Sequence, residues 1–409
     1  MQIACYRGLL PVVAILLGFQ AQLAGEAPAT IDALLETGLP SRRIDLVFLA
    51  EGYTQSELPT FRLHAAYVKD VLFSSEPFRE YQNYFNAFAV SVSSSESGSD
   101  HPSLGMFRDT YFNSSYESYG LDHALTVPPN DRDPNIEHGY GKAYHLLEQL
   151  LPDWDVLVFL VNDPAFGGWG DARGVVCSAD YFMGEVIAHE LGHTLAGLGD
   201  EYSDAFPNDP EPVREEPNTT RETRREFIKW KAWIEDSTRI PTPSSALYEN
   251  LVGLFQGARY QQQGWYRPKL RCRMNNWINL FCEVCTEALV KSICLRTGTV
   301  DSFSPQVARL HLTSAPVQLS VSPMSPAAHS LQTSWYIDGH RVAGPEDSRL
   351  ALEISRASLG PGTHNVKVEV FDPTTMVRSD PEDLLKNEVI WEIQVSDRRT
   401  RRNPNRVFR

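Results

Sequence analysis

The sequence is short of positive charge. It carries 37 lysines and arginines against 52 aspartates and glutamates, which gives a formal net charge of −15 over 409 residues. A protein that binds nucleic acid or anionic lipid needs a basic face, so this balance argues against both as main partners. The charge itself indicates only a soluble protein. Beyond its N-terminal region the chain also lacks any stretch that approaches the ~20 apolar residues of a membrane-spanning helix.

The one long apolar run lies at the N-terminus, over residues 9–19, directly behind Arg7 and ahead of small residues up to Ala27. This layout is typical of a secretory signal peptide, and the run is too short to span a bilayer comfortably. We therefore expect residues 1–27 to be a signal peptide. The mature chain would then be secreted, periplasmic or on the cell surface, without stable membrane insertion. The alternative is a retained membrane anchor, although a lipoprotein-type anchor is not expected because Cys5 precedes the run.

Cysteine is scarce, with six in the chain, and four of them fall close together at Cys272, Cys282, Cys285 and Cys294. In an oxidising compartment such a group indicates disulfides first, which leaves Cys177 as an odd thiol. A structural zinc site made by the same four cysteines is the alternative, because two of them have the Cys-x-x-Cys spacing of metal ligands.

Strand and helix signals alternate over the first 200 residues, which predicts an α/β layer with a mixed, substantially parallel sheet. We expect strands at 44–50, 88–93, 156–161 and 174–178, and helices from about 54 to 72 and over 77–84, 138–151 and 184–196. Residues 93–133 and 203–245 are predicted to be irregular excursions, the second with a short helix over 227–234. The glycines of 167–170 indicate a flexible link.

The pattern changes after about residue 300. Apolar and polar residues alternate at period two over 317–321, 333–337, 350–354 and 366–370, with turn signals such as Asp338-Gly339 between them. Short alternating strands at this spacing indicate an all-β sandwich of the Ig-like type, which we place at residues 300–396. A basic, disordered tail is expected over 397–409.

The strongest chemical signal is the motif His189-Glu190-Leu-Gly-His193. Positions i and i+4 of a helix share one face, so His189 and His193 can hold one Zn²⁺ through their imidazoles. Glu190 lies beside that face, where its carboxylate can take a proton from a metal-activated water and later deliver it to the leaving amine. A core helix with two satisfied histidines is the alternative. The strand predicted before the helix and the glycines after it favour the catalytic interpretation.

A catalytic zinc usually needs a third protein ligand and an open position. Asp200 and Glu201 follow Gly197 and Gly199, and these glycines let the chain reverse and return a carboxylate to the metal. We expect Asp200 to be the third ligand, with Glu201 as the alternative. Tyr202 is a candidate donor to the oxyanion that develops during hydrolysis.

These residues resemble the IgA-peptidase family of bacterial metallopeptidases, whose helix carries His-Glu-x-x-His followed by a glycine-rich turn and Asp-Glu-Tyr. The similarity covers about residues 45–295, through Glu51-Gly-Tyr-Thr54, Glu76-Pro-Phe, Tyr84-Phe-Asn86, Glu96-Ser-Gly98, Asp155-Val-Leu-Val158, Tyr266-Arg-Pro268, Cys272-x-Met274 and Phe281-Cys-x-x-Cys285.

The resemblance implies a zinc endopeptidase with a metzincin-like catalytic domain, here residues 28–299, in which a methionine lies beneath the metal as packing support. By position that methionine is Met274. The chain departs from the usual metzincin pattern, because Ala196 takes the place of a glycine and Asp200 comes one residue late. This departure concerns only the identity of the third ligand. A bound zinc ion is still expected.

Together these observations predict a secreted zinc-dependent endopeptidase with one catalytic Zn²⁺ and a protein or peptide substrate. Two other classes of function remain open: a zinc amidohydrolase that acts on cell-wall or other non-protein amides, and a non-catalytic binding or adhesion protein that works through the sandwich. Cleavage of an unstructured protein such as casein separates the endopeptidase from the amidohydrolase. The intact set of His189, Glu190 and His193 weighs against a non-catalytic binding protein.

Overall fold

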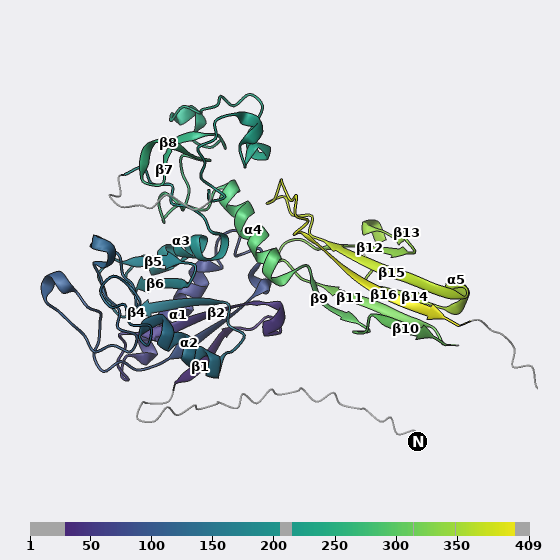
Figure 1. Cartoon of the computed structure of the whole chain (residues 1–409), viewed down its shortest axis with the longest axis horizontal. Helices are drawn as coiled ribbons and strands as arrows, with labels where there is room; N and C mark the ends of the chain where they lie inside the picture. Colours follow the sequence, from purple (N-terminus) through teal and green to yellow (C-terminus); the bar gives the residue numbers. More distant parts are fainter. Residues whose placement is uncertain (1–28, 205–214, 314, 348, 397–409) are drawn as a thin grey trace, which may run out of the picture.

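The computed structural model describes residues 29–204, 215–313, 315–347 and 349–396. The predicted signal peptide and the predicted basic tail lie outside these residues. No helix in the described part of the chain is both long and apolar enough to cross a membrane. An N-terminal part of mixed helices and strands and a C-terminal part made mainly of strands lie next to each other along the longest axis of the molecule (Figure 1).

A six-stranded mixed sheet forms the centre of the N-terminal part, in the order β1-β3-β2-β4-β6-β5. Its strands are β1 (Thr30–Leu35), β2 (Ile44–Glu51), β3 (Phe85–Ser91), β4 (Val156–Val161), β5 (Gly168–Asp171) and β6 (Gly174–Ser178). The four inner strands run parallel, and β1 and β5 pair antiparallel at the two edges. Every residue of β2, β3, β4 and β6 is buried, which explains their nearly continuous apolar sequences.

The sequence predicted the four inner strands, and the structure confirms them. It corrects the expectation at residues 167–170, because Gly168–Asp171 forms the edge strand β5 instead of a flexible link.

The longer helices are α1 (Leu58–Leu72), α2 (Gly139–Leu150), α3 (Met183–Ala196) and α4 (Glu283–Thr297). The first three were predicted, and α3 packs between α1 and α4 and against the sheet strands β5 and β6. The helix predicted over 77–84 is wrong, since only a short 3-10 turn forms at Gln82–Tyr84. Tyr81 and Tyr84 are fully buried there, and tertiary packing of these rings overrides the local helical pattern. The short helix predicted over 227–234 is likewise wrong, because this stretch has only two 3-10 turns, at Arg225–Phe227 and Lys231–Trp233.

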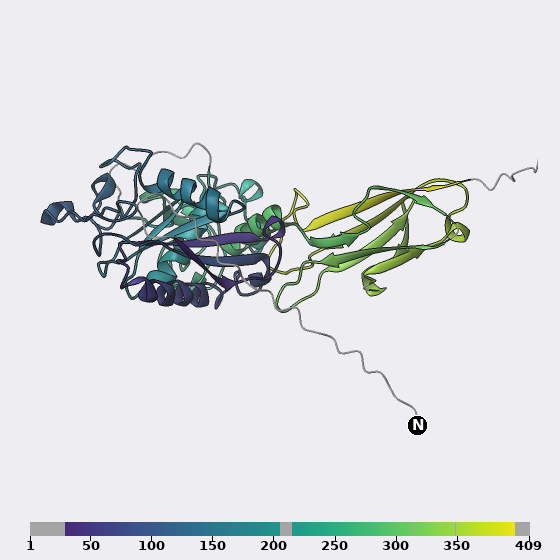
Figure 2. The same ribbon diagram turned by 90° about the horizontal axis from the view of Figure 1, so that it is seen from below.

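The C-terminal part consists of two sheets, ordered β10-β16-β15-β12-β13 and β14-β11-β9. Their strands are β9 (Val300–Ser304), β10 (Arg309–Leu312), β11 (Val317–Pro323), β12 (Gln332–Ile337), β13 (His340–Ala343), β14 (Ala351–Ile354), β15 (Gly362–Phe371) and β16 (Lys386–Val395). Trp335 and Trp391 of the larger sheet are fully buried, and Phe303 of the smaller sheet packs 6.0 Å from Trp391, measured between ring centroids. The two layers are visible in Figure 2. The alternating strands predicted from the sequence are confirmed.

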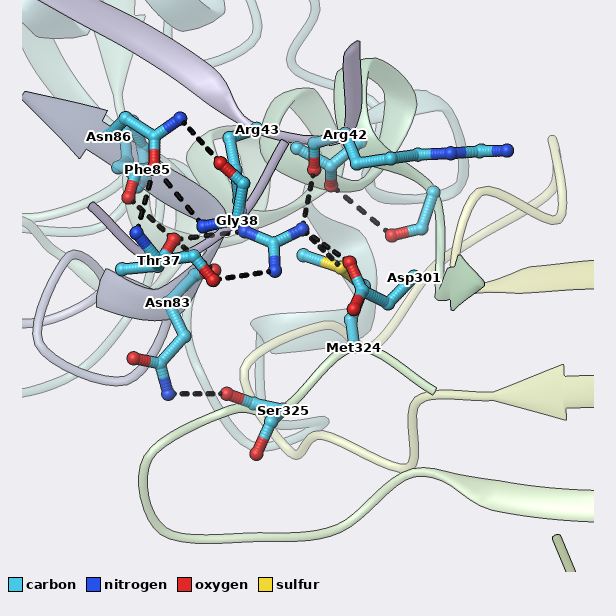
Figure 3. A network of polar contacts seen from close by, with 12 residues as sticks. Thr37, Gly38, Arg42, Arg43, Asn83, Phe85, Asn86, Asp301, Met324 and Ser325 are labelled. Carbon is cyan, nitrogen blue, oxygen red and sulfur yellow. Dashed lines mark hydrogen bonds and ion pairs between the residues drawn. The ribbon is translucent and has the colours of Figure 1, made fainter. Parts of the chain in front are cut away.

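Arg43 joins the two parts (Figure 3). Its side chain is only 7% exposed, and its Nη1 lies 2.6 Å from Asp301 Oδ1 of the C-terminal part. The same guanidinium donates to Thr37 Oγ1 and to the carbonyl of Arg42, so it is held in place from the N-terminal side. Asn83 adds a further link by donating to the carbonyl of Ser325.

A second group of polar contacts across the junction centres on His329. One ring nitrogen lies 2.7 Å from Glu80 and the other lies 2.6 Å from Asp372. Asp372 is fully buried and also accepts a hydrogen bond of 2.9 Å from the Tyr81 hydroxyl. Polar contacts that share partners in this way fix the orientation of the two parts.

Candidate metal centre

Helix α3 carries the predicted metal-binding motif. It starts soon after β6 and ends at Gly197, whose φ of +60° forms the left-handed cap that terminates many helices. Residues such as Ile187 and Leu191 bury one side of α3 in the core. His189 and His193 therefore share the opposite side, with their Nε2 atoms 3.3 Å apart.

Two backbone carbonyls set the tautomer of both histidines. His189 Nδ1 lies 2.8 Å from the carbonyl of Arg273, and His193 Nδ1 lies 2.6 Å from the carbonyl of Leu198. Because a carbonyl can only accept, each Nδ1 carries the hydrogen. In the neutral form of each imidazole, Nε2 then keeps its lone pair, which points into the site as metal binding requires.

Asp200 completes this arrangement. Its Oδ1 lies 3.2 Å from His189 Nε2 and 3.5 Å from His193 Nε2. Apart from these two histidines, the buried oxygen has no hydrogen-bond partner among the described residues. A tetrahedral zinc ion with bonds of about 2.0–2.1 Å places its ligand atoms about 3.3 Å apart. The spacing of the three atoms and the absence of any other partner for the oxygen therefore fit a zinc ion.

The electrostatics of the site also favour a cation. Burial alone would lower the pKa of His193, but the Asp200 and Glu190 carboxylates raise it to about 10. Burial would raise the pKa of Asp200, yet the two imidazoles hold it well below its usual range. A positive charge between these groups, whether a proton or a metal ion, is thus strongly stabilised.

Glu190 lies next to the histidines and against β5. Its Oε2 is 4.0 Å from His193 Nε2, and burial raises the pKa of its carboxyl group. A Cβ at Gly170 would lie 2.7 Å from that Oε2 and 2.8 Å from Glu190 Cβ, so β5 can approach only because this residue is glycine. Thr194 Oγ1 donates to the carbonyl of Asp171 over 2.9 Å and fastens the strand to α3.

Tyr260 also belongs to the site, although no sequence motif indicates it. Tyr260 lies in the turn between β7 (Phe255–Ala258) and β8 (Gln261–Arg267), where Arg259 and Tyr260 both have positive φ. Their backbone N–H groups donate to the carbonyls of Asp200 and Tyr202, and the Tyr260 hydroxyl donates to Asp200 Oδ2 over 2.5 Å. This hairpin thereby orients the carboxylate. The turn lacks the Asn-Gly signal that marks such a hairpin in a sequence.

The other predicted site residues take different places. The Tyr202 ring centroid lies 6.0 Å from that of His189, and burial raises the pKa of its hydroxyl, which stays protonated at neutral pH. A Cβ at Gly192 would lie 2.9 Å from Met274 Sδ, so this methionine packs directly against α3. Glu201 is fully buried but is directed away from the histidines, and Asn218 donates to its Oε1 over 2.9 Å.

The cysteines require a correction, because all five in the described residues are free thiols. Cys272 Sγ and Cys285 Sγ lie 3.6 Å apart, well beyond the ~2.05 Å of a disulfide bond. Cys294 comes nine residues after Cys285 on α4, which places it on the opposite side of the helix. The predicted pair of disulfides and the alternative four-cysteine site both differ from the structure, in which Glu201 takes the fourth place.

Comparisons with known proteins bear on the same region. A family model described as IgA Peptidase M64 matches residues 32–249 and 244–293. No curated protein matches the chain. Among solved structures, fibronectin(III)-like modules of Clostridium thermocellum CbhA match 23% of this chain and 45% of their own chain, at 11% identity and a TM-score of 0.17. A likeness of that size assigns no fold.

The family match covers more than half of the chain. It includes α3 with His189, Glu190 and His193, the segment with Asp200, and Met274. The protein therefore belongs to the IgA peptidase M64 family of metallopeptidases.

Proposed function

We propose that the protein is a secreted, zinc-dependent endopeptidase in which His189, His193 and Asp200 bind the metal. The observation that carries this proposal is the convergence of two imidazole nitrogens and one buried carboxylate oxygen within 3.5 Å of one another. Apart from the two histidines, that oxygen has no hydrogen-bond partner among the described residues. Two neutral histidines and one carboxylate leave a zinc ion with net positive charge and a free coordination position.

A bound zinc ion at this place supplies a Lewis acid that polarises the substrate carbonyl and lowers the pKa of water. Glu190 accepts the proton of the attacking water and transfers it to the leaving amine. Burial raises the pKa of its carboxyl group, which brings it closer to the operating pH of such a base. Tyr260 holds Asp200 in position, and the Tyr202 hydroxyl is the proposed donor to the developing oxyanion.

The open edge of strand β5 favours a polypeptide as the substrate. It pairs with β6 on one side, and its other side pairs with no strand in the described residues. An extended peptide that adds to this edge forms backbone hydrogen bonds and passes directly beside Glu190, which lies against Gly170. A small non-protein amide has no backbone with which to use such an edge. This difference favours an endopeptidase over an amidohydrolase for cell-wall substrates.

The test uses the purified protein with casein as an unstructured substrate and isolated cell-wall peptides as the comparison. We expect cleavage of casein that a chelator abolishes and added Zn²⁺ restores. N-terminal sequencing of the exported protein is expected to start near residue 28. Hydrolysis of cell-wall peptides without any cleavage of casein would overturn the proposal.

A further inference from the structure

A second group of potential metal ligands lies next to the histidine site, because one of its members, Glu201, directly follows Asp200 in the chain. Cys272, Cys282, Cys285 and Glu201 each direct a sulfur or oxygen atom to one point, with all four atoms within 4.8 Å of one another. All four residues are buried. They come from three segments: the stretch just before Met274, the start of α4, and the residue that follows Asp200.

The distances within this group match those of a metal-bound set. The sulfurs of Cys272 and Cys285 are 3.6 Å apart, and Cys285 Sγ lies 3.5 Å from Glu201 Oε1. Tetrahedral zinc with bonds of about 2.3 Å to sulfur and 2.0 Å to oxygen separates two sulfurs by about 3.8 Å, and sulfur from oxygen by about 3.5 Å. A Cys272–Cys285 disulfide would instead require the sulfurs to approach to about 2.05 Å.

The surroundings of the group support the same interpretation. Asn218 donates to Glu201 Oε1, and the backbone N–H of Cys282 donates to Cys272 Sγ over 3.4 Å. Such hydrogen bonds orient ligands and stabilise thiolates. The nearby cation Arg267 donates to the backbone carbonyl of Glu201. Ionising a buried carboxylate and buried thiols side by side is costly without a positive charge in their midst, and a divalent ion supplies that charge.

We propose that Cys272, Cys282, Cys285 and Glu201 bind a second Zn²⁺ with a structural role. Three soft thiolates favour zinc over the oxygen-preferring divalent ions. Four protein ligands fill the tetrahedron and leave no position for water or substrate, which is the arrangement of structural rather than catalytic zinc. This site is distinct from the one formed by the two histidines.

The second ion would fasten three segments that touch the active site. Glu201 is bonded to Asp200, and its backbone N–H donates to the carbonyl of Met274 over 2.8 Å. The carbonyl of Arg273, next to Cys272, accepts the hydrogen bond from His189 Nδ1. Loss of the second ion therefore loosens both the carboxylate and one imidazole of the catalytic site, so its effect on catalysis is indirect.

The test measures zinc content and free thiols in the purified mature protein, which lacks Cys5 of the predicted signal peptide. We expect two zinc ions per chain in the wild type and one in His193→Ala, in which the second site is intact. Cys285→Ser should lose the second ion, whereas Cys177→Ser and Cys294→Ser should retain both. If Cys285→Ser does not fold, His193→Ala loaded with Co²⁺ serves instead. We expect it to show the charge-transfer absorption of a thiolate–cobalt bond.

Thiol titration separates this site from a disulfide. Unfolding in the presence of a chelator and without reductant should release all five thiols of the described chain. Two fewer thiols would show a disulfide and overturn the proposal. A wild type with one zinc and a His193→Ala variant with none would also overturn it. Because no readout depends on peptide hydrolysis, failure here is distinct from failure of the proposed enzymatic activity.

Discussion

Asp200 and Glu201 are adjacent in the chain, yet their carboxylates are directed into two different sites. Asp200 Oδ1 lies 3.2 Å from His189 Nε2. Glu201 Oε1 lies 3.5 Å from Cys285 Sγ. One short segment of the chain thereby serves both groups of ligands.

The first prediction compares Asp200→Ala with Glu201→Ala. Asp200→Ala should abolish high-affinity zinc binding at the histidines together with activity, because it removes a metal-binding atom. Glu201→Ala should weaken the histidine site less, by about 10–100-fold, as loss of a supporting contact does. Chelator competition measures both affinities. If Glu201→Ala loses the histidine-bound metal while Asp200→Ala keeps it, the assignment of the third ligand is reversed.

The second prediction concerns Glu190. Glu190→Gln should retain zinc and lower kcat by roughly 10²–10⁴-fold, because glutamine keeps the shape of the side chain but cannot accept a proton. Metal analysis and steady-state kinetics on the same preparation provide the measurement. A kcat close to that of the wild type would show that another group acts as the base.

The third prediction separates the two tyrosines. Tyr260→Phe removes the hydrogen bond to Asp200 Oδ2 and should weaken zinc binding by about 10-fold or more. Tyr202→Phe should leave zinc affinity unchanged and lower kcat, since its hydroxyl is proposed to act on the oxyanion. Equal losses of zinc affinity in both variants would contradict these separate roles.

The fourth prediction tests the contact between β5 and α3. Gly170→Ala places a methyl group within 3.0 Å of Glu190 atoms, including its backbone carbonyl, and should reduce peptide hydrolysis strongly while zinc stays bound. Gly168→Ala is the matched control. Its new methyl group would lie 3.6 Å from Glu190 Oε1 and would meet chiefly a Val186 methyl group, so a smaller effect is expected. The idea fails if the two variants have the same activity.

The fifth prediction concerns residues 300–396, which contribute no residue to either candidate metal site described above. A chain that ends at residue 299 should still bind zinc and hydrolyse peptides. Its Tm should fall, because Arg43 loses Asp301 and the buried Tyr81 loses Asp372. A shortened chain that is folded and binds zinc but cleaves no peptide would show that the C-terminal part contributes to the site.

The sequence predicted the elements whose apolar pattern is local. Strands β2, β4 and β6 and helix α3 carry such patterns, and the structure has them close to the expected bounds. Helix α4 was not predicted, since it is buried on several sides and shows little periodicity. Strand β5 was misinterpreted because its glycines indicate flexibility, whereas in the structure they allow contact with Glu190.

The site was predictable only where its residues are close in sequence. The spacing of His189 and His193 on one helix is enough to bring them together. Tyr260 and Asn218 reach Asp200 and Glu201 through contacts between residues 60 and 17 positions apart, and no local pattern encodes such contacts. Spacing also left undecided which of the two adjacent carboxylates turns towards the metal. The direction of each side chain depends on the β7–β8 hairpin and the cysteine cluster around them.

The glycines of β5 have a consequence for the choice of cleavage site. Next to Glu190 the enzyme presents strand backbone at Gly168 and Gly170, where there are no side chains to discriminate between substrate residues. Recognition at this point would rest on the peptide backbone, which is the same in every protein. A folded substrate keeps its own backbone groups paired, so the segments open to cleavage would be those already unpaired. Local unfolding of the target, more than its amino-acid sequence, would then decide where the chain is cut.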